Sequence, residues 1–205
     1  MLFRSARALE GGAIVLPALQ SGGRVPSPGV GSGAQLQADG SAVLDGEKFA
    51  IPLGDKATSF IVDARCGDAI ALMNVAANAP GVTLRTQEAV DGVAFTHAAF
   101  KGVKVAKSDV LATGGEAALL LDRLRFPLQC ALAAELVGVA QELFDRTLDY
   151  LRTRRAFGRS LGAFQALQHR AVDIYGDIEL ARALTLEARS EEHTSELQSH
   201  HDLVC

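Results

Sequence analysis

The chain of 205 residues has no tryptophan, two tyrosines, two methionines and three cysteines. Cys66, Cys130 and Cys205 are odd in number and far apart, which excludes a disulfide framework and a structural zinc site. No window holds the ~18 consecutive apolar residues that a membrane-spanning helix needs. No long apolar segment followed by a cleavage site is seen at the start of the chain. We therefore predict a cytoplasmic protein without a membrane anchor.

Neither sign of charge dominates the sequence. Lysine and arginine number 20 against 24 acidic residues, a net charge of −4, which argues against a nucleic-acid-binding protein. With 48% hydrophobic residues the chain can bury a core, so it is not a disordered protein. The sequence has no phosphate-binding Gly-rich loop, no GxSxG and no CxxC. His97 and His169 lack metal-ligand spacing, so we predict no metal site and interpret both as structural residues.

The tail at residues 189–205 differs from the chain before it. Residues 179–188 (ELARALTLEA) are helix formers on an apolar repeat, and the tail loses that repeat. RSEEHTSELQSH (189–200) resembles the translation of a common sequencing adapter, so we interpret 189–205 as a non-native tail. The alternatives are a genuine flexible polar tail or a metal-binding tract around His193, His200 and His201.

Residues 1–110 have the pattern of a β-domain. Short β-rich runs alternate with turn signals such as Asp39-Gly40, Asp45-Gly46 and Asp91-Gly92, and residues 22–33 form a loop of small residues. So many short strands at regular spacing favour an antiparallel β-barrel or sandwich. The predicted strands are Ala13–Leu19, Ala34–Ala38, Ala42–Ile51, Ser59–Ala64, Ala69–Val75, Gly81–Arg85, Val93–Phe100 and Val103–Val105.

Residues 111–188 have helical periodicity instead. One apolar stripe runs from Leu120 to Leu151 in steps of three or four residues, and a second runs from Phe164 to Ala181. Pro127 predicts a kink or a late start of the first helix. Because two helices cannot enclose a four-helix core, we expect half of an up-down bundle. Either subunit contacts complete it or the gene model is cut short. The predicted fold class is therefore α+β.

The segment between the two helices is rich in arginine. Five arginines and no acidic residue lie between Asp149 and Asp173. Arginine pairs bidentately with phosphate oxygens, and a helix start near Ala163 also favours an anion. Phe157 could pack on a heterocycle, and Gln165 can donate and accept hydrogen bonds. The set suits a phosphate-bearing cofactor with a flat ring. The alternative is that Arg152, Arg154 and Arg155 complement the dipole at the end of the first helix.

Several segments carry a family resemblance. Within residues 133–188, AELVGVAQ, YLRTRRAFGRSLGAFQALQHR and ELARAL resemble the first two helices of the C-terminal domain of acyl-CoA dehydrogenases. LDGEKFAIPLGDKATSFIVDAR (44–65) and GGAIVLPALQSGGR (11–24) resemble the middle β-domain of that family. The likeness covers residues 11–188, nearly all of the chain before the tail.

The resemblance implies an FAD-dependent oxidoreductase that converts an acyl-CoA to a trans-2-enoyl-CoA in lipid metabolism such as fatty acid β-oxidation. It also implies dimers or tetramers that share the FAD site between subunits, and electron-transfer flavoprotein or a similar acceptor. Arg154 matches the arginine that reaches the FAD pyrophosphate of the neighbouring subunit. Phe157 matches the aromatic residue of that motif, and Phe164 and Gln165 match the second pair of flavin contacts.

The sequence also departs from the family pattern around the flavin and the CoA. The aromatic residue that flanks the flavin falls near Ala50, with Phe49 beside it, and a threonine contact falls at Pro52. An Asp-x-x-Arg pair that contacts CoA aligns with Phe126 and Gln129, while Asp122 and Arg125 keep that spacing one turn earlier.

No catalytic base can be assigned. The family's usual glutamate lies beyond the second helix, and its alternative position on the first helix falls near Leu128. We therefore expect an inactive fragment, without the family's N-terminal helical domain and last two helices. One alternative is a non-catalytic partner subunit of a heteromeric acyl-CoA dehydrogenase. Another is an unrelated β-plus-helix interaction module.

Overall fold

The computed structural model describes residues 11–21 and 31–201. Most of the small-residue loop expected at 22–33, and the first ten residues, lie outside the described residues. The chain divides into two compact units, Met1–Asp122 and Arg123–Cys205. The first unit holds β1 (Val15–Ala18), β2 (Gly33–Leu36), β3 (Ala42–Pro52), β4 (Ser59–Cys66), β5 (Ala69–Ala76), β6 (Val82–Glu88), β7 (Ala94–Val105), β8 (Val110–Thr113) and the first turns of α2 (Gly114–Thr153). The rest of α2, β9 (Arg155–Ala156), β10 (Arg159–Ser160) and α3 (Gln165–His201) form the second unit.

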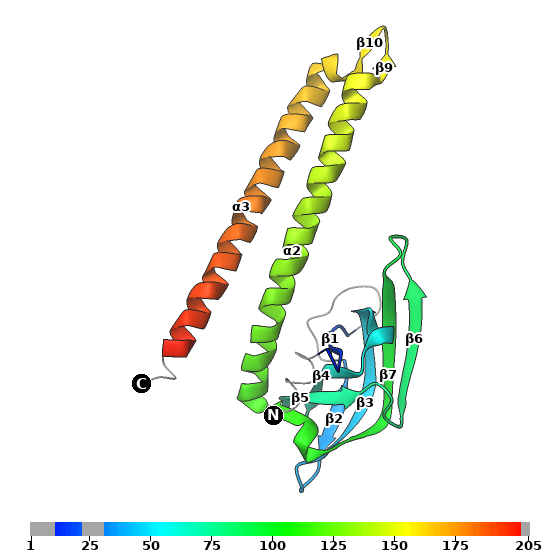
Figure 1. Cartoon of the computed structure of the whole chain (residues 1–205), viewed down its shortest axis with the longest axis vertical. Coiled ribbons are helices and arrows are strands. Elements are labelled where there is room, and N and C mark those ends of the chain that lie inside the picture. The colour runs from blue at the N-terminus through cyan, green and yellow to red at the C-terminus, as the bar shows by residue number, and fades with distance from the viewer. Residues whose placement is uncertain (1–10, 22–30, 202–205) are drawn as a thin grey trace. The chain divides into compact units, whose positions relative to one another are not determined.

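One eight-stranded sheet makes up the first unit (Figure 1). Its strands follow the order β6-β7-β3-β2-β4-β5-β8, and β1 pairs with β4 off this path. The core consists of the inward-facing residues of these strands, among them Leu44, Phe60 and Met73. The α+β class predicted from the sequence is confirmed.

The sheet differs from the predicted antiparallel barrel or sandwich in two respects. It is mixed, because β1 and β2 both run parallel to β4. Two reversals of the chain separate β2 from β4, so the two strands point the same way when they meet at Gly33 and Arg65. The sheet is also not a closed barrel: among the described strands, β6 and β8 end the path and do not pair with each other.

The strands at the end of this unit also differ from the prediction. The runs expected at Val93–Phe100 and Val103–Val105 are one strand, β7, in which Lys101 and Gly102 lie opposite the single residue Asp45. Gly102 has φ 59° and donates its N–H to Asp45 Oδ1 at 2.8 Å, as in a glycine bulge. Strand β8 was not predicted, because its four residues are too few to show alternation next to a helix.

The core of the sheet unit encloses an ion pair. Lys48 Nζ, from β3, donates to Asp63 Oδ1 of β4 at 2.7 Å and to Ser21 Oγ at 3.0 Å. The Lys48 and Asp63 side chains are fully buried. A buried charge is tolerated only when it is paired and hydrogen-bonded, so these two residues depend on each other.

In the second unit, α2 and α3 run side by side and are joined at one end by β9 and β10 (Figure 1). They are antiparallel: Phe144 meets Tyr175 with ring centres 6.3 Å apart, and Arg182 Nη2 donates to Gln141 Oε1 at 2.8 Å. Helix α2 begins at Gly114 and continues through Pro127 as one helix, so the late start allowed for at this proline is not observed.

Helix α3 extends beyond the predicted helical repeat and ends at His201. Glutamate, leucine and glutamine in the tail favour a helix whatever the origin of the sequence. A helical tail is therefore compatible with both a translated adapter and a native segment, and the non-native origin of 189–205 stays a prediction.

Candidate functional site

The arginine-rich turn is a short β-hairpin between the two long helices. Arg154 follows the end of α2; its backbone N–H donates to Tyr150 O at 2.8 Å, and its carbonyl accepts from Leu161 N–H at 2.9 Å. Strands β9 and β10 then pair antiparallel, with Arg159 opposite Ala156. The main chain of the turn is thus fixed on both sides, and the Arg154 side chain is exposed.

Phe157 lies at the tip of this hairpin and is 93% exposed. Its φ is 52° and that of Gly158 is 81°, so both central residues of the turn have positive φ, as two-residue hairpins prefer. Glycine or asparagine usually occupies such a position, and a phenylalanine there is strained. Phe157 thus exposes its ring to solvent from a strained main chain.

Phe164 lies next to Phe157, the residue at the tip of the hairpin. Its ring lies edge-on to Phe157, with centres 6.3 Å apart and an interplanar angle of 84°. The guanidinium of Arg159 lies over the same ring, 4.0 Å from its centre. Gln165 is the first residue of α3, and its side chain is exposed. The four predicted residues therefore lie on the connection between α2 and α3, and Arg159, one of the five arginines counted in the sequence, joins them there.

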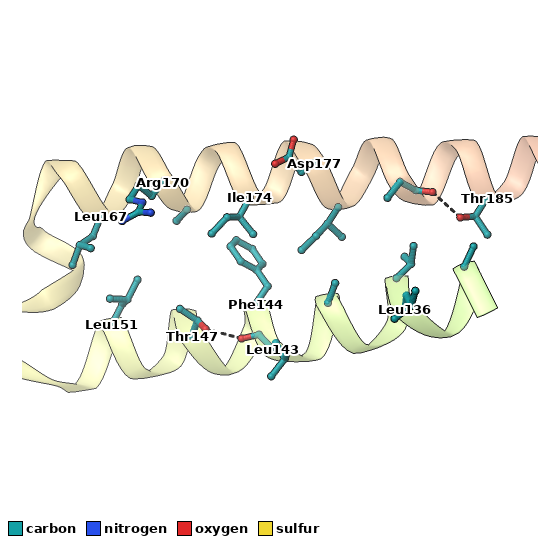
Figure 2. Close-up of a pocket in the computed structure, with 16 residues that line it drawn as sticks. Leu136, Leu143, Phe144, Thr147, Leu151, Leu167, Arg170, Ile174, Asp177 and Thr185 are labelled. Atoms are coloured by element: carbon teal, nitrogen blue, oxygen red, sulfur yellow. Dashed lines mark hydrogen bonds between the residues drawn. The ribbon is translucent and has the colours of Figure 1, made fainter. Parts of the chain in front are cut away.

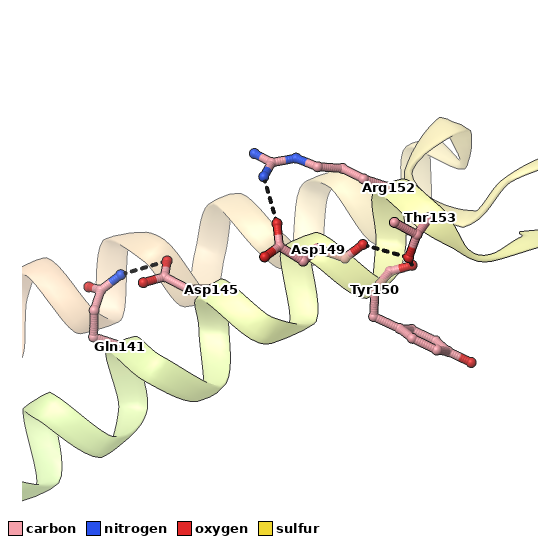
Figure 3. Close-up of polar contacts among 6 residues, drawn as sticks. All are labelled: Gln141, Asp145, Asp149, Tyr150, Arg152 and Thr153. Carbon is pink, nitrogen blue, oxygen red and sulfur yellow. Dashed lines mark hydrogen bonds and ion pairs between the residues drawn. The ribbon is translucent and has the colours of Figure 1, made fainter.

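The arginines of the turn differ in their surroundings. Arg152 Nη1 donates to Asp149 Oδ1 at 3.0 Å on the last turns of α2 (Figure 3). For Arg152, this contact fits the alternative interpretation given above, in which the arginine has a structural role at the end of the first helix. Among the described residues, the side chains of Arg154, Arg155 and Arg159 form no hydrogen bond or ion pair. Three guanidinium groups thus remain available to an anion.

A second candidate region is a bulge in β3. Lys48 pairs with Ala98 and Ile51 with Thr96, so Phe49 and Ala50 together lie opposite one residue of β7, His97. Ala50 has φ 50°, which marks the extra residue of the bulge. Phe49 and His97 stack with ring centres 4.3 Å apart, and Glu47 Oε2 lies 3.4 Å from His97 Nε2. This region is where the resemblance puts a flavin-flanking aromatic residue.

The positions expected to contact CoA, and the alternative position of the base, lie on α2. Phe126, Leu128 and Gln129 flank Pro127, and none of their side chains can take up a proton. Asp122 and Arg125 lie one turn earlier on the same helix. The structure therefore offers no carboxylate at Leu128.

An apolar groove runs between α2 and α3 (Figure 2). It has a volume of about 790 Å³, and Phe144 and Ile178 form its floor at 8% and 6% exposure. Leu136 and Leu143 stay 67% and 60% exposed along it. Arg170 and Asp177 are its charged members. An open apolar groove of this kind is what half of a bundle presents.

Two absences concern the described part of the chain. Neither of its helices has a stretch long and apolar enough to cross a membrane. It also contains no group of three or more His, Cys, Asp or Glu side chains placed to hold a metal ion.

Comparison with known proteins places this arrangement in a family. The family model described as "Acyl-CoA dehydrogenase, C-terminal domain" matches residues 129–201. The chain is 30% identical over 163 residues to a probable short/branched chain specific acyl-CoA dehydrogenase of Dictyostelium discoideum, a match that covers 76% of this chain and 40% of the relative. It is 46% identical over 57 residues to the acyl-CoA dehydrogenase IpdE2 of Mycobacterium tuberculosis, which covers 28% of this chain and 18% of that protein.

The fold is also that of solved members. The crystal structure of the ChsE4–ChsE5 complex from Mycobacterium tuberculosis matches with a TM-score of 0.69 and 28% identity, over 89% of this chain and 48% of that chain. The chain thus spans about half or less of the length of the relatives it matches. Sequence and fold agree over both units, and we conclude that the chain belongs to the acyl-CoA dehydrogenase family.

Proposed function

We propose that this chain is part of an FAD-dependent acyl-CoA dehydrogenase that oxidises an acyl-CoA thioester to the trans-2-enoyl-CoA. The observation that carries the proposal is the hairpin of Arg154 and Phe157, whose cation and ring both face solvent on a fixed main chain. Like subunits would share the FAD site, and electron-transfer flavoprotein or a similar acceptor would take the electrons. Unpaired Cys66 and Cys130 are consistent with a cytoplasmic location.

The residues of the hairpin fit the cofactor. Exposed arginines match the charge of a pyrophosphate, and Phe157 and Phe164 offer apolar faces to a flat ring. Gln165 would hydrogen-bond to the cofactor from the start of α3. At the bulge in β3, Ala50 and Pro52 offer no aromatic face or hydroxyl group, but Phe49 stacked on His97 supplies rings at the same place.

When bound, FAD would supply the acceptor for the hydride that leaves the β-carbon of the thioester. In this proposal Arg154 and Phe157 bind and orient the cofactor, and they move no proton. Removal of the α-proton needs a carboxylate within hydrogen-bond reach, and Leu128 cannot serve. In this proposal the base comes from the position that the family resemblance puts beyond the second helix.

Substitution of Arg154 tests the proposal. We expect the purified chain to bind FAD, and Arg154→Gln to weaken binding about tenfold, because charge-assisted hydrogen bonds contribute ~1.5–3 kcal/mol. Fluorescence anisotropy of the flavin during a protein titration measures the affinity. Arg152→Gln is the matched control and should change it less than about twofold, since Asp149 already holds Arg152. Absence of FAD binding, or equal losses in both variants, would contradict the proposal.

A non-catalytic partner subunit is the second candidate. It is favoured by the side chains at Phe126, Leu128 and Gln129, and the ChsE4–ChsE5 structure is that of a complex. In both candidates Leu128 leaves the alternative base position on α2 without a carboxylate, so we expect no dye reduction when an acyl-CoA and FAD are added to the chain. Dye reduction faster than in the same mixture without protein would contradict this expectation.

Long-read sequencing of the locus across codon 188 separates the two candidates. An enzyme requires the reading frame to continue into further helices that carry a glutamate or aspartate. A neutral residue at that position would favour the partner subunit. If the genomic frame reads RSEEHTSELQSHHDLVC and then stops, the interpretation of a non-native tail is wrong.

A further inference from the structure

The groove between α2 and α3 leaves apolar side chains of both helices exposed. Leu143 of α2 and Ile174 of α3 are two of them. They lie at the same level of the helix pair, because Phe144, next to Leu143, meets Tyr175, next to Ile174. Apolar side chains gathered in an open groove indicate an interaction surface. The groove belongs wholly to the helical unit, and its lining includes none of the hairpin residues proposed to bind FAD.

The charges of the groove are placed symmetrically about Ile174. Arg170 lies one turn before it on α3 and Asp177 one turn after it, and both side chains are exposed (Figure 2). The two are about 10.5 Å apart along the helix, whereas side chains that pair on one helix are three or four residues apart. Among the described residues, neither side chain forms a hydrogen bond or ion pair. The α2 residues that line the groove are uncharged, so α2 offers neither charge a partner there.

A second copy of the chain supplies both partners if its α3 packs antiparallel across the first. A two-fold axis at Ile174 sets Arg170 of each copy opposite Asp177 of the other, because a two-fold interface forms every contact twice. A parallel arrangement would instead set like charges against each other. In the antiparallel arrangement the four helices of the two copies enclose one apolar core, as in a four-helix bundle.

The groove is large enough for a specific but weak dimer. Its lining runs from Ala133 to Leu151 on α2 and from Leu167 to Thr185 on α3. Each run is about 27 Å long at 1.5 Å per residue, and two adjacent helices are about 20 Å wide. A second copy would therefore bury about 500 Å² on each side. The total of about 1,000 Å² lies at the lower limit for a specific interface, so we expect a dissociation constant in the micromolar range.

We infer that a second copy of this chain covers the groove, with the two α3 helices antiparallel and the Arg170–Asp177 ion pair formed twice. The inference goes beyond the proposed function and does not rest on it, because the groove takes no residue from the hairpin. Failure of FAD to bind would leave it unchanged.

Exchange of the two charges tests the inference. Sedimentation equilibrium of the purified 205-residue chain at about 1–300 µM should show a monomer–dimer equilibrium. Arg170→Asp and Asp177→Arg should each raise the dissociation constant about tenfold, because two attractive pairs become repulsive. An equimolar mixture of these two variants should recover the wild-type constant, since one then carries two carboxylates and the other two guanidinium groups. Mixing could not reverse a loss caused by misfolding.

Two further variants serve as controls. Glu187→Arg reverses an exposed carboxylate of α3 outside the groove and should change the dissociation constant less than about twofold. Leu143→Glu puts a charge at the centre of the groove and should abolish the dimer, while far-UV circular dichroism stays unchanged because Leu143 is exposed in a single copy. A monomer at every concentration, association beyond two molecules, or no recovery in the mixture would overturn the inference. A monomer would mean that the groove takes a different occupant.

Discussion

Replacing Asp63 by alanine is expected to destabilise the sheet unit by about 3–5 kcal/mol, the usual cost of leaving one member of a buried ion pair without the other. Lys48 would lose its carboxylate partner in a site that is 0% exposed and would keep Ser21 Oγ at 3.0 Å. Hydrogen exchange of the β3 and β4 amides measures the effect locally. Both tyrosines, Tyr150 and Tyr175, lie in the helical unit, so tyrosine fluorescence reports that unit separately.

Two controls separate the burial of the charge from the loss of a contact. Lys48→Met with Asp63→Leu removes both charges and should restore most of the stability, because a hydrophobic pair of similar volume is often neutral or better. Lys56→Ala breaks an ion pair of the same unit in which the lysine is 69% exposed, and should cost less than about 1 kcal/mol. If Asp63→Ala costs no more than Lys56→Ala, the pair does not hold the core together.

The periodicity of the sequence predicted the elements well and their pairing less well. Alternation locates β3 and β4 because each has one face in the core. It carries no information on which strands pair, so the parallel contacts of β1 and β2 with β4 could not be predicted. The Lys48–Asp63 pair was missed for a related reason. Two opposite charges inside apolar runs are a signal, but the meeting of β3 and β4 depends on the tertiary fold.

The candidate site shows the same division. Arg154, Phe157, Phe164 and Gln165 were assigned through the family resemblance of one short segment, and local chain geometry brings them to the connection between α2 and α3. Arg159 was counted among the five arginines of this segment, but its contact with Phe164 was not predicted, because it depends on how the hairpin closes before α3 begins. The positive φ of Phe157 could likewise not be predicted from the sequence, because phenylalanine is not a residue that signals a turn.

Gly81 is the position where an added methyl group meets the most resistance. A Cβ there would lie 2.3 Å from the carbonyl oxygen of Lys101 and 3.2 Å from Val103 Cγ2, and its φ is 90°. The carbonyl of Gly81 also accepts the N–H of Lys101 at 2.9 Å, so the clash falls on a main-chain contact that joins β6 to β7. A flexible side chain could turn aside, but the backbone of a paired strand cannot do so without breaking its ladder.

Gly81→Ala should therefore destabilise the sheet unit by about 2–5 kcal/mol, of which backbone strain contributes about 1–2 and overpacking about 1–3. Gly92→Ala is the matched control, because Gly92 has φ 81° in the turn after β6 and nothing lies within 4 Å of its added Cβ. It should cost only the strain of about 1–2 kcal/mol. Urea unfolding followed by far-UV circular dichroism, with hydrogen exchange of the β6 and β7 amides, gives both values. Equal losses in the two variants would mean that the approach of Gly81 to Lys101 is not tight, and that positive φ alone explains the need for glycine at both ends of β6.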